Sequence, residues 1–323
     1  MNRIASLAIL PLMALALAWA WKLQVDASVE AVTPPTEGQL VVANLRSESL
    51  TFIPLAAPGD ATGLSLFGPP HEMLEAGGRL YVTLGRAGMV AAVDPGAPGV
   101  LAEYEYEQSE PHGLAYEDGR IAVTFDATGT VSLVSPANFA QLDSFRTGAT
   151  PHAVALTGNE LYVTDSRDNA IRLIDLTTGA AKTAPTGALP ESLAVVAGVV
   201  VTGDHDGRSL SIFRRGTLEP VGTVALDGAP VRVVPLDGRS VAVALSDTGR
   251  VASVDLAKLA VTRTVAVAGR PDGICLSPSG SYAAVVSNAE DVVQVFRLSD
   301  WALAATYRTG DGPGACLWRS GTH

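Results

Sequence analysis

Short apolar runs recur along the chain with polar turns between them, and the same order of runs returns about every 40 residues. Each repeat opens with a proline that is followed by an apolar strand, and successive opening prolines are 39 to 42 residues apart. The seven openers begin at Pro70, Pro111, Pro151, Pro190, Pro230, Pro271 and Pro313. A period of this length, filled by four short strands, is typical of the blades of a β-propeller.

The unit that begins at Pro151 shows its four strands most clearly. They are predicted at about 152–156, 161–164, 170–176 and 180–186. Turn-forming residues separate them, such as Thr157-Gly158-Asn159 and Thr178-Gly179. β-branched residues in the runs favour packed strands, and no helix of consequence is expected after the N-terminal segment.

The two ends of the chain complete one blade together. Second strands are predicted to start near Leu40, Leu80, Ile121, Leu161, Val199, Val241 and Ala283. The first of these has no opener before it, and the last opener has no second strand after it. Joining the ends closes the ring and leaves no unpaired sheet edge at the join. We therefore predict an all-β, seven-bladed β-propeller of four-stranded antiparallel blades over residues 39–323, closed by N-terminal strands plus the C-terminal innermost strand.

Composition agrees with one large ring. Seven such units need roughly 280 residues, so a single domain accounts for most of the chain. The hydrophobic content of 47% and the charged content of 17% are enough for a large core between the blades. The net charge of -11 and the pI of about 4.9 speak against nucleic acid as a partner, because binding a phosphate backbone requires a basic face.

The N-terminus has the pattern of an export element. Arg3 precedes an uncharged apolar run from Ile4 to Trp21, which ends in the small-x-small sequence Ala18-Trp19-Ala20. Residues 1–21 are predicted to be a signal peptide or, if uncleaved, an N-terminal anchor just long enough to span a bilayer, and cleavage is favoured. The propeller then lies in the periplasm or outside the cell, and it meets a membrane only through an uncleaved segment. Residues 22–38 are predicted to be a short stiff spacer.

Several strands carry a further signature. Leu80-Tyr81-Val82-Thr83 and Leu161-Tyr162-Val163-Thr164-Asp165 are second strands, and Ile171-Arg172-Leu173-Ile174-Asp175 is a third strand. With the proline openers, these motifs resemble the YVTN-type β-propellers, and the resemblance covers about residues 39–318. It implies an exported seven-bladed protein that binds a ligand or partner, in a family similar in appearance to lactonase-type and haem d1-type propellers. Cys-x-x-Cys-His is absent, which excludes a covalently attached c-type haem domain.

The position after the opening proline holds histidine in three consecutive units and a carboxylate in the next. These residues are His71, His112, His152 and Glu191. Inner strands of a propeller start at one mouth of the channel, so these side chains are expected to converge. Three imidazoles and a carboxylate suit zinc, or a copper or iron ion, and these four residues are the candidate metal ligands. Glu191 could instead orient an imidazole or only face water. A structural interpretation, in which each imidazole bonds to the backbone of a neighbouring blade or to a loop carboxylate, is favoured over the metal site, and contact with an organic ligand is the third interpretation.

Cys275 and Cys316 lie on the inner strands of adjacent blades. An oxidising compartment permits a disulfide between them. We expect the two positions to be equivalent in the repeat, so that both side chains lean in the same rotational sense and one points away from the other. We therefore expect two buried thiols, with a disulfide as the alternative.

The sequence does not decide whether the protein is an enzyme, and it favours a non-catalytic role. It contains no Gly-x-Ser-x-Gly elbow, phosphate-binding loop or His-Glu-x-x-His pair. The leading prediction is an exported monomer that binds a small ligand or a periplasmic protein at its channel mouth, in the sharper form with a transition-metal ion. One alternative is a lactonase-like hydrolase that uses the same channel-mouth residues. Another is a purely structural interaction module of the cell envelope.

Overall fold

The computed structural model describes residues 32–106 and 109–320. The predicted signal peptide or anchor, residues 1–21, lies outside the described residues, as does most of the predicted spacer. The described residues from Pro34 onward form one compact unit. In the described ranges, no helix is long and apolar enough to cross a membrane.

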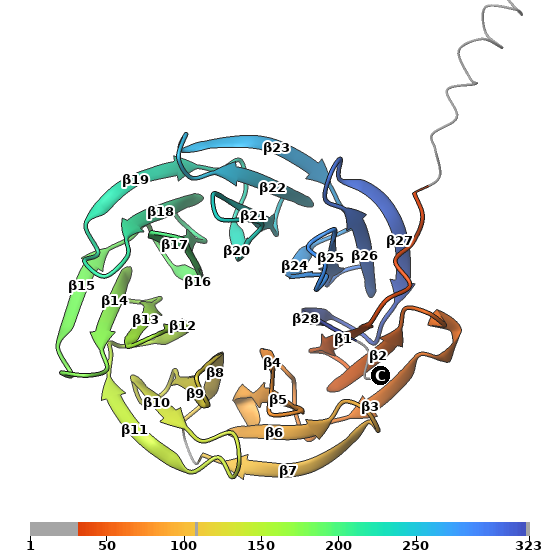
Figure 1. Cartoon of the computed structure of the whole chain (residues 1–323), viewed down its shortest axis with the longest axis horizontal. Helices are drawn as coiled ribbons and strands as arrows, with labels where there is room; N and C mark the ends of the chain where they lie inside the picture. Colours follow the sequence, from red (N-terminus) through yellow and green to blue (C-terminus); the bar gives the residue numbers. More distant parts are fainter. Residues whose placement is uncertain (1–31, 107–108, 321–323) are drawn as a thin grey trace, which may run out of the picture. The chain divides into compact units, whose positions relative to one another are not determined.

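Seven four-stranded antiparallel sheets form a closed ring, with one strand of each sheet facing the central channel (Figure 1). We number these sheets as blades 1 to 7 and give their strands from the channel outward. Blade 1 consists of β28 (Pro313–Arg319), β1 (Gln39–Asn44), β2 (Ser49–Pro54) and β3 (Thr62–Ser65). Blade 2 consists of β4 (Met73–Ala76), β5 (Arg79–Leu84), β6 (Met89–Asp94) and β7 (Gly99–Glu105). Blade 3 consists of β8 (Pro111–Glu117), β9 (Arg120–Phe125), β10 (Thr130–Val134) and β11 (Gln141–Arg146).

The other four blades follow the same order. Blade 4 consists of β12 (Pro151–Thr157), β13 (Glu160–Asp165), β14 (Ala170–Asp175) and β15 (Ala181–Pro185). Blade 5 consists of β16 (Pro190–Val196), β17 (Val199–Asp204), β18 (Ser209–Arg214) and β19 (Pro220–Ala225). Blade 6 consists of β20 (Pro230–Pro235), β21 (Ser240–Leu245), β22 (Arg250–Asp255) and β23 (Ala260–Ala266). Blade 7 consists of β24 (Pro271–Leu276), β25 (Tyr282–Ser287), β26 (Val292–Arg297) and β27 (Ala302–Arg308).

The predicted architecture and the closure of the ring are confirmed. The C-terminal strand β28 pairs antiparallel with β1, so the two ends of the propeller share blade 1. Within the described residues, helical structure is limited to two short 3-10 turns, η1 (Pro58–Asp60) and η2 (Gly85–Ala87).

The core fills the spaces between neighbouring blades. In β5, Leu80 and Val82 pack with residues of blade 1, whereas Tyr81, between them in sequence, packs with residues of blade 3. Strands that are buried on both faces appear in the sequence as continuous apolar runs, and the second strands could be predicted from these runs.

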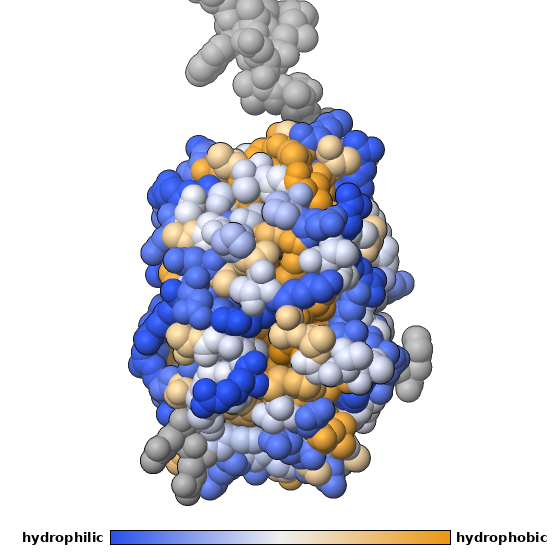
Figure 2. Space-filling view, turned by 90° about the vertical axis from the view of Figure 1, so that its left-hand side faces the viewer, coloured by the Kyte–Doolittle hydropathy of each residue, from blue (hydrophilic) through white to orange (hydrophobic). Residues whose placement is uncertain are grey.

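The outermost strands are the exposed edges of the sheets. Five of the seven, β7, β11, β19, β23 and β27, expose one or two large apolar side chains among polar ones, for example Leu142 in β11 and Leu303 in β27. Figure 2 shows one side of the ring, where hydrophilic residues predominate and hydrophobic residues form small patches between them. Charged residues on edge strands oppose pairing with another sheet.

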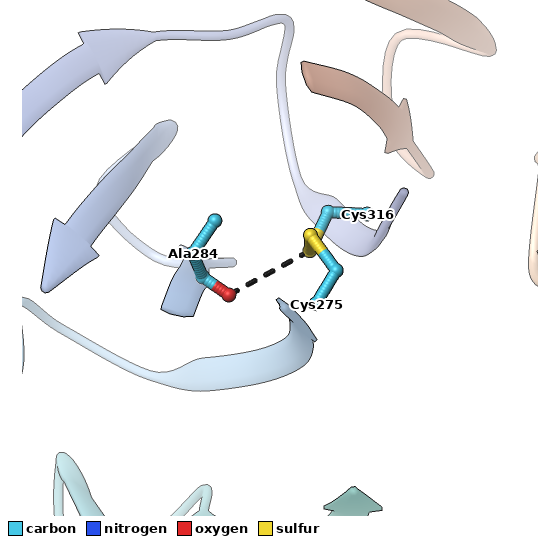
Figure 3. Close-up of a disulfide and its surroundings, with 3 residues drawn as sticks. All are labelled: Cys275, Ala284 and Cys316. Carbon is cyan, nitrogen blue, oxygen red and sulfur yellow. Dashed lines mark hydrogen bonds between the residues drawn. A yellow bond between two sulfur atoms is a disulfide. The ribbon is translucent and has the colours of Figure 1, made fainter. Parts of the chain in front are cut away.

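The expectation of two buried thiols is wrong, because Cys275 and Cys316 form a disulfide (Figure 3). Cys275 pairs with Ala284, the third residue of β25, whereas Cys316 pairs with Val42, the fourth residue of β1. The two cysteines are thus one position out of register with each other. Because side chains alternate between the two faces of a sheet, this offset turns the side chains toward each other across the space between blades 7 and 1. Their Cα atoms are 5.7 Å apart, within the usual range for a disulfide.

Candidate functional site

Three histidine side chains gather at one end of the channel. His112 and His152 are the second residues of β8 and β12, and His71 lies just before β4. The ring centroids of His71 and His112 are 4.9 Å apart, and those of His112 and His152 are 3.9 Å apart. The structure therefore brings together three imidazoles that are separated by about 40 residues each in the sequence.

Buried threonines of the second strands hold these histidines in place. Thr83 of β5 accepts a hydrogen bond from the backbone N–H of Glu72 at 3.0 Å and donates its hydroxyl proton to the carbonyl of His112 at 2.8 Å. Thr124 of β9 repeats the arrangement one blade further on, with the N–H of Gly113 and the carbonyl of His152.

Thr83 ends the run Leu80-Tyr81-Val82-Thr83 of the YVTN-like signature, and Thr124 holds the corresponding place in β9. Their hydroxyls link the opener of one blade to the opener of the next. The same repeat that builds the fold therefore fixes the spacing of the imidazoles.

The hydrogen bond of His152 determines its tautomer. Its Nδ1 lies 2.8 Å from the backbone carbonyl of Glu191. A carbonyl oxygen can only accept, so Nδ1 carries the proton and Nε2 holds the free lone pair. In contrast, Nδ1 of His112 is buried without a hydrogen-bond partner among the described residues.

All three imidazoles are neutral at neutral pH. Burial lowers the pKa of His152 to about 4 and holds the pKa of His112 well below its ordinary value. Burial also lowers the pKa of His71. Neutral imidazole is the form that donates a lone pair to a metal ion.

An ion pair crosses the channel beside the histidines. Oε1 of Glu72, from blade 2, lies 2.5 Å from Nη2 of Arg232, from blade 6. β4 and β20 face each other across the centre of the ring in Figure 1. Both residues line a cavity of about 210 Å³ together with His112, His152 and Glu191.

The sequence analysis missed Glu72 and Arg232, although a signal was present. Both occupy the second position after the opening proline. The other units have small residues there, namely Gly113, Ala153, Ser192, Gly273 and Ala315. Small residues leave the channel open, so two charges at this position could have been predicted to meet in it.

Glu191 contributes to the site mainly through its backbone. Its carbonyl accepts the proton of His152 Nδ1, while its side chain lines the cavity. Burial raises the pKa of its carboxyl. The charge of His205 lowers that pKa, and the charge of Asp206 raises it further. The carboxylate of Glu191 is therefore coupled to the loop after β17.

Acidic and basic side chains are mixed at this end of the channel. Glu72 is paired with Arg232, and the imidazoles are neutral. Burial raises the pKa of Asp272 to about 6, against the opposing charges of Arg232 and Arg270, so Asp272 is still mostly ionised at pH 7. Arg270 also acts on Glu191 and Arg86 acts on His71, so charges of both signs surround the site.

The three rings pack against one another, and their nitrogens do not converge on one point. Across residues 32–106 and 109–320, no group of three or more His, Cys, Asp or Glu side chains stands in position to hold a metal ion. The chemistry of the donor set fits a transition metal, whereas the arrangement would have to change by rotation of at least one ring. The metal site at His71, His112, His152 and Glu191 stays a prediction.

Comparison with known proteins supports the fold alone. No family model and no curated protein matches the chain. Among solved structures, AztD from Citrobacter koseri in its apo form is similar, with a TM-score of 0.69 and 14% identity over 89% of this chain and 99% of that one. A protein of unknown function from Desulfotomaculum acetoxidans gives a TM-score of 0.73 and 13% identity over 88% of this chain and 100% of that one.

A third similar structure is a protein from Bacteroides fragilis that has been put forward as a 6-phosphogluconolactonase. Its TM-score is 0.72 and its identity is 17%, over 88% of this chain and 98% of that one. The protein thus belongs to the class of seven-bladed β-propellers. At these identities, the site and not the fold must carry an argument about function.

Proposed function

We propose that this protein is an exported, non-catalytic binding protein whose channel holds a divalent transition-metal ion between His71, His112 and His152. The observation that carries the proposal is the contact of the three imidazole rings, with centroids 4.9 and 3.9 Å apart at one end of the channel. Zinc, copper and iron ions all accept imidazole nitrogen.

The protonation and burial of the site support a metal. The imidazoles are neutral, so no proton has to leave before a ligand bond forms. Nδ1 of His112 is buried and has no hydrogen-bond partner in the part of the chain that the structure describes, and a metal ion would compensate that loss.

Export rests on the N-terminal pattern. The apolar run after Arg3 and its small-x-small end support delivery to the periplasm or beyond, where the propeller would meet its ion. The proposed protein acts as a monomer, since the blade at the join is completed within the chain and needs no strand from a second copy.

Metal analysis of protein purified from the cell envelope without an affinity tag tests the proposal. We expect zinc, copper or iron to bind with one ion per chain, and His112→Ala to weaken binding about 100-fold or more. His205→Ala is the matched control, because His205 bonds to Asp206 in the loop after β17 and is not among the residues that line the cavity. Failure of the unmodified protein to bind any of these ions, or equal binding by His112→Ala, would contradict the proposal and favour a scaffold of the envelope.

A lactonase-like hydrolase is the second candidate. One observation favours it: Glu191, whose buried carboxyl has a raised pKa, lines the same cavity as the neutral imidazole of His152. An acid and a base side by side could hydrolyse an ester. The similar protein from Bacteroides fragilis has been put forward as a lactonase. Turnover of simple lactones that disappears in His112→Ala and His152→Ala would support this role, and rates unchanged by either substitution would remove it.

A further inference from the structure

We propose that the channel cavity binds a small zwitterion, namely a free α-amino acid with an aliphatic side chain. Arg232 binds its carboxylate, Glu191 binds its ammonium group, and apolar residues deeper in the channel contact its side chain. This inference goes beyond the proposed function, because none of these contacts involves a metal ion.

Arg232 has donors available for a carboxylate. A guanidinium carries five N–H donors, and Nη2 of Arg232 donates one of them to Glu72. This is the only hydrogen bond of the Arg232 side chain among the described residues. The side chain is 23% exposed and lines the cavity, so its remaining donors are open to a ligand in the channel. Guanidinium groups bind carboxylates with strong, charge-assisted hydrogen bonds.

Glu191 supplies the opposite charge from the neighbouring blade. It is the second residue of β16, and Arg232 is the third residue of β20, the next inner strand around the channel (Figure 1). The carboxylate of Glu191 lines the same cavity and has no hydrogen bond or ion pair among the described residues. A donor and an acceptor on neighbouring blades suit an α-amino acid, because its ammonium and carboxylate groups are joined through a single carbon atom.

The mixture of charges selects a zwitterion over a simple ion. An anion that reached Arg232 would also meet the carboxylate of Glu191, and a cation that reached Glu191 would also meet the guanidinium. In either case like charges would repel each other at short range in a partly buried site. A molecule with both charges satisfies both side chains and leaves the ion pair of Arg232 with Glu72 in place.

An apolar layer lies below the charged one. Leu114, Val154 and Leu193 each stand three positions after an opening proline, on blades 3, 4 and 5. All three line the cavity and are partly exposed, although they belong to inner strands. Leu193 is two residues further along β16 than Glu191, so this layer lies deeper in the channel than the charges. An aliphatic side chain that points inward from the charged groups would be removed from water there.

The volume of the cavity limits the size of the ligand. The cavity of about 210 Å³ corresponds to about seven water molecules at their share of liquid volume. A ligand with roughly that number of non-hydrogen atoms has the size of valine or leucine. Tryptophan is too large, and glycine has no side chain to reach the apolar layer.

Calorimetric titration of the protein with L-leucine at pH 7, after a chelator has removed any metal, tests the inference. We expect one leucine to bind per chain and L-valine to bind comparably. Glycine and L-tryptophan should bind at least about tenfold more weakly. Two analogues test the charged contacts in the unmodified protein: isocaproate is leucine without the ammonium group, and isoamylamine is leucine without the carboxylate. Each should bind at least about tenfold more weakly than leucine.

Variants test the same contacts from the side of the protein. Arg232→Gln and Glu191→Gln should each weaken leucine binding at least about tenfold. Arg214→Gln and Glu219→Gln are the matched controls, because these two side chains are 65% and 69% exposed and do not line the cavity. Circular dichroism and thermal unfolding check that each variant folds. Arg232→Lys, which keeps the charge but loses the planar fork, serves as a second variant at this position.

Three results would overturn the inference. They are no binding of leucine or valine at millimolar concentration, binding of isocaproate or isoamylamine as tight as that of leucine, and leucine affinity unchanged in both Arg232→Gln and Glu191→Gln. The metal analysis tests the proposed function separately, because leucine binding is measured without metal. Leucine binding by a protein that takes up no zinc, copper or iron would support this inference and contradict the metal site.

Discussion

Arg319, the last residue of β28, forms a two-pronged ion pair with Glu75 of β4. Its Nε lies 3.1 Å from Oε2 and its Nη2 lies 3.0 Å from Oε1 of Glu75. Nη1 also donates to Gln39 Oε1 at 3.1 Å. The Arg319 side chain is only 6% exposed. A single guanidinium therefore connects the C-terminal strand, the first strand of the ring and the neighbouring blade.

Replacing Arg319 by Ala should destabilise the propeller. The change removes four hydrogen bonds of the guanidinium, three to side chains and one to the carbonyl of Pro95. It leaves Glu75 and Gln39 without this partner near the closure, so we expect the free energy of unfolding to fall by about 2–4 kcal/mol. Chemical denaturation measures the loss. Arg214→Ala is the control, since the Arg214–Glu219 pair is 65% and 69% exposed and should matter by less than about 0.5 kcal/mol. Equal stabilities of the two variants would show that the closure does not depend on Arg319.

The disulfide should stabilise the same region of the ring. Cys275 and Cys316 are 41 residues apart. Closing a loop of that length lowers the entropy of the unfolded chain and so raises its free energy by about 4 kcal/mol in the chain-entropy description. We expect a reductant to lower the unfolding temperature of the wild type and to leave a Cys275→Ala/Cys316→Ala variant unchanged. Thiol alkylation of the unreduced, denatured protein should find no free thiol, and two labelled cysteines would contradict the bond.

The repeat alone was sufficient to predict the fold. The strands predicted at 161–164 and 170–176 correspond to β13 (Glu160–Asp165) and β14 (Ala170–Asp175). This agreement has a physical reason, because each blade is a local unit whose strands pair with their sequence neighbours. The pairing of β1 with β28 joins strands from opposite ends of the propeller sequence. It could be predicted because the first repeat lacks an opener and the last opener lacks a second strand.

The site was predictable only in part. His71, His112 and His152 share a repeat position, so ring geometry was enough to bring them together. Glu72 and Arg232 are 160 residues apart and meet only because blades 2 and 6 face each other across the channel. The disulfide was misjudged because Cys275 is the fourth residue after its proline and Cys316 the third after its own. This one-residue difference reverses the face of a strand.

The stability of the metal-free protein should fall in mild acid through His152. Its pKa is about 4 in the folded state and about 6.5 in the unfolded chain, so the unfolded state takes up the proton first. The contribution of neutral His152 to the free energy of unfolding is up to about 3 kcal/mol. It is fully present above pH 6.5 and is lost as the pH falls toward 4. Asp272 acts in the opposite sense, because its raised pKa of about 6 makes the folded state bind more protons in the same range.

A difference measurement isolates the histidine from the carboxyl. The free energy of unfolding of the wild type minus that of His152→Gln should decrease between pH 7 and pH 4, since Asp272 is common to both proteins. Denaturation at a series of pH values measures it. A flat difference, or an imidazole signal of His152 that titrates near pH 6.5 in NMR spectra, would contradict the burial of this ring.

Thr124 should control both stability and the position of His152. Its hydroxyl accepts from the N–H of Gly113 at 2.7 Å and donates to the carbonyl of His152 at 2.9 Å. Thr124→Val keeps the shape but removes both bonds, and it leaves a buried N–H and a carbonyl without this partner. We expect a loss of about 1–3 kcal/mol of stability. Thr124→Ser keeps the hydroxyl and should retain most of the hydrogen bonding.

The same pair of variants separates positioning from simple stability. If the threonine hydroxyls set the spacing of the imidazoles, Thr124→Val should weaken zinc binding at a temperature where the variant is fully folded, and Thr124→Ser should not. Val251→Ala provides a comparison, because Val251 is buried in blade 6 and packs against blade 7, away from the histidines. This substitution should cost about 2–3 kcal/mol of stability while zinc affinity stays unchanged. Equal zinc affinities in Thr124→Val and Thr124→Ser would mean that the backbone of the blades holds the histidines in place without the hydroxyl.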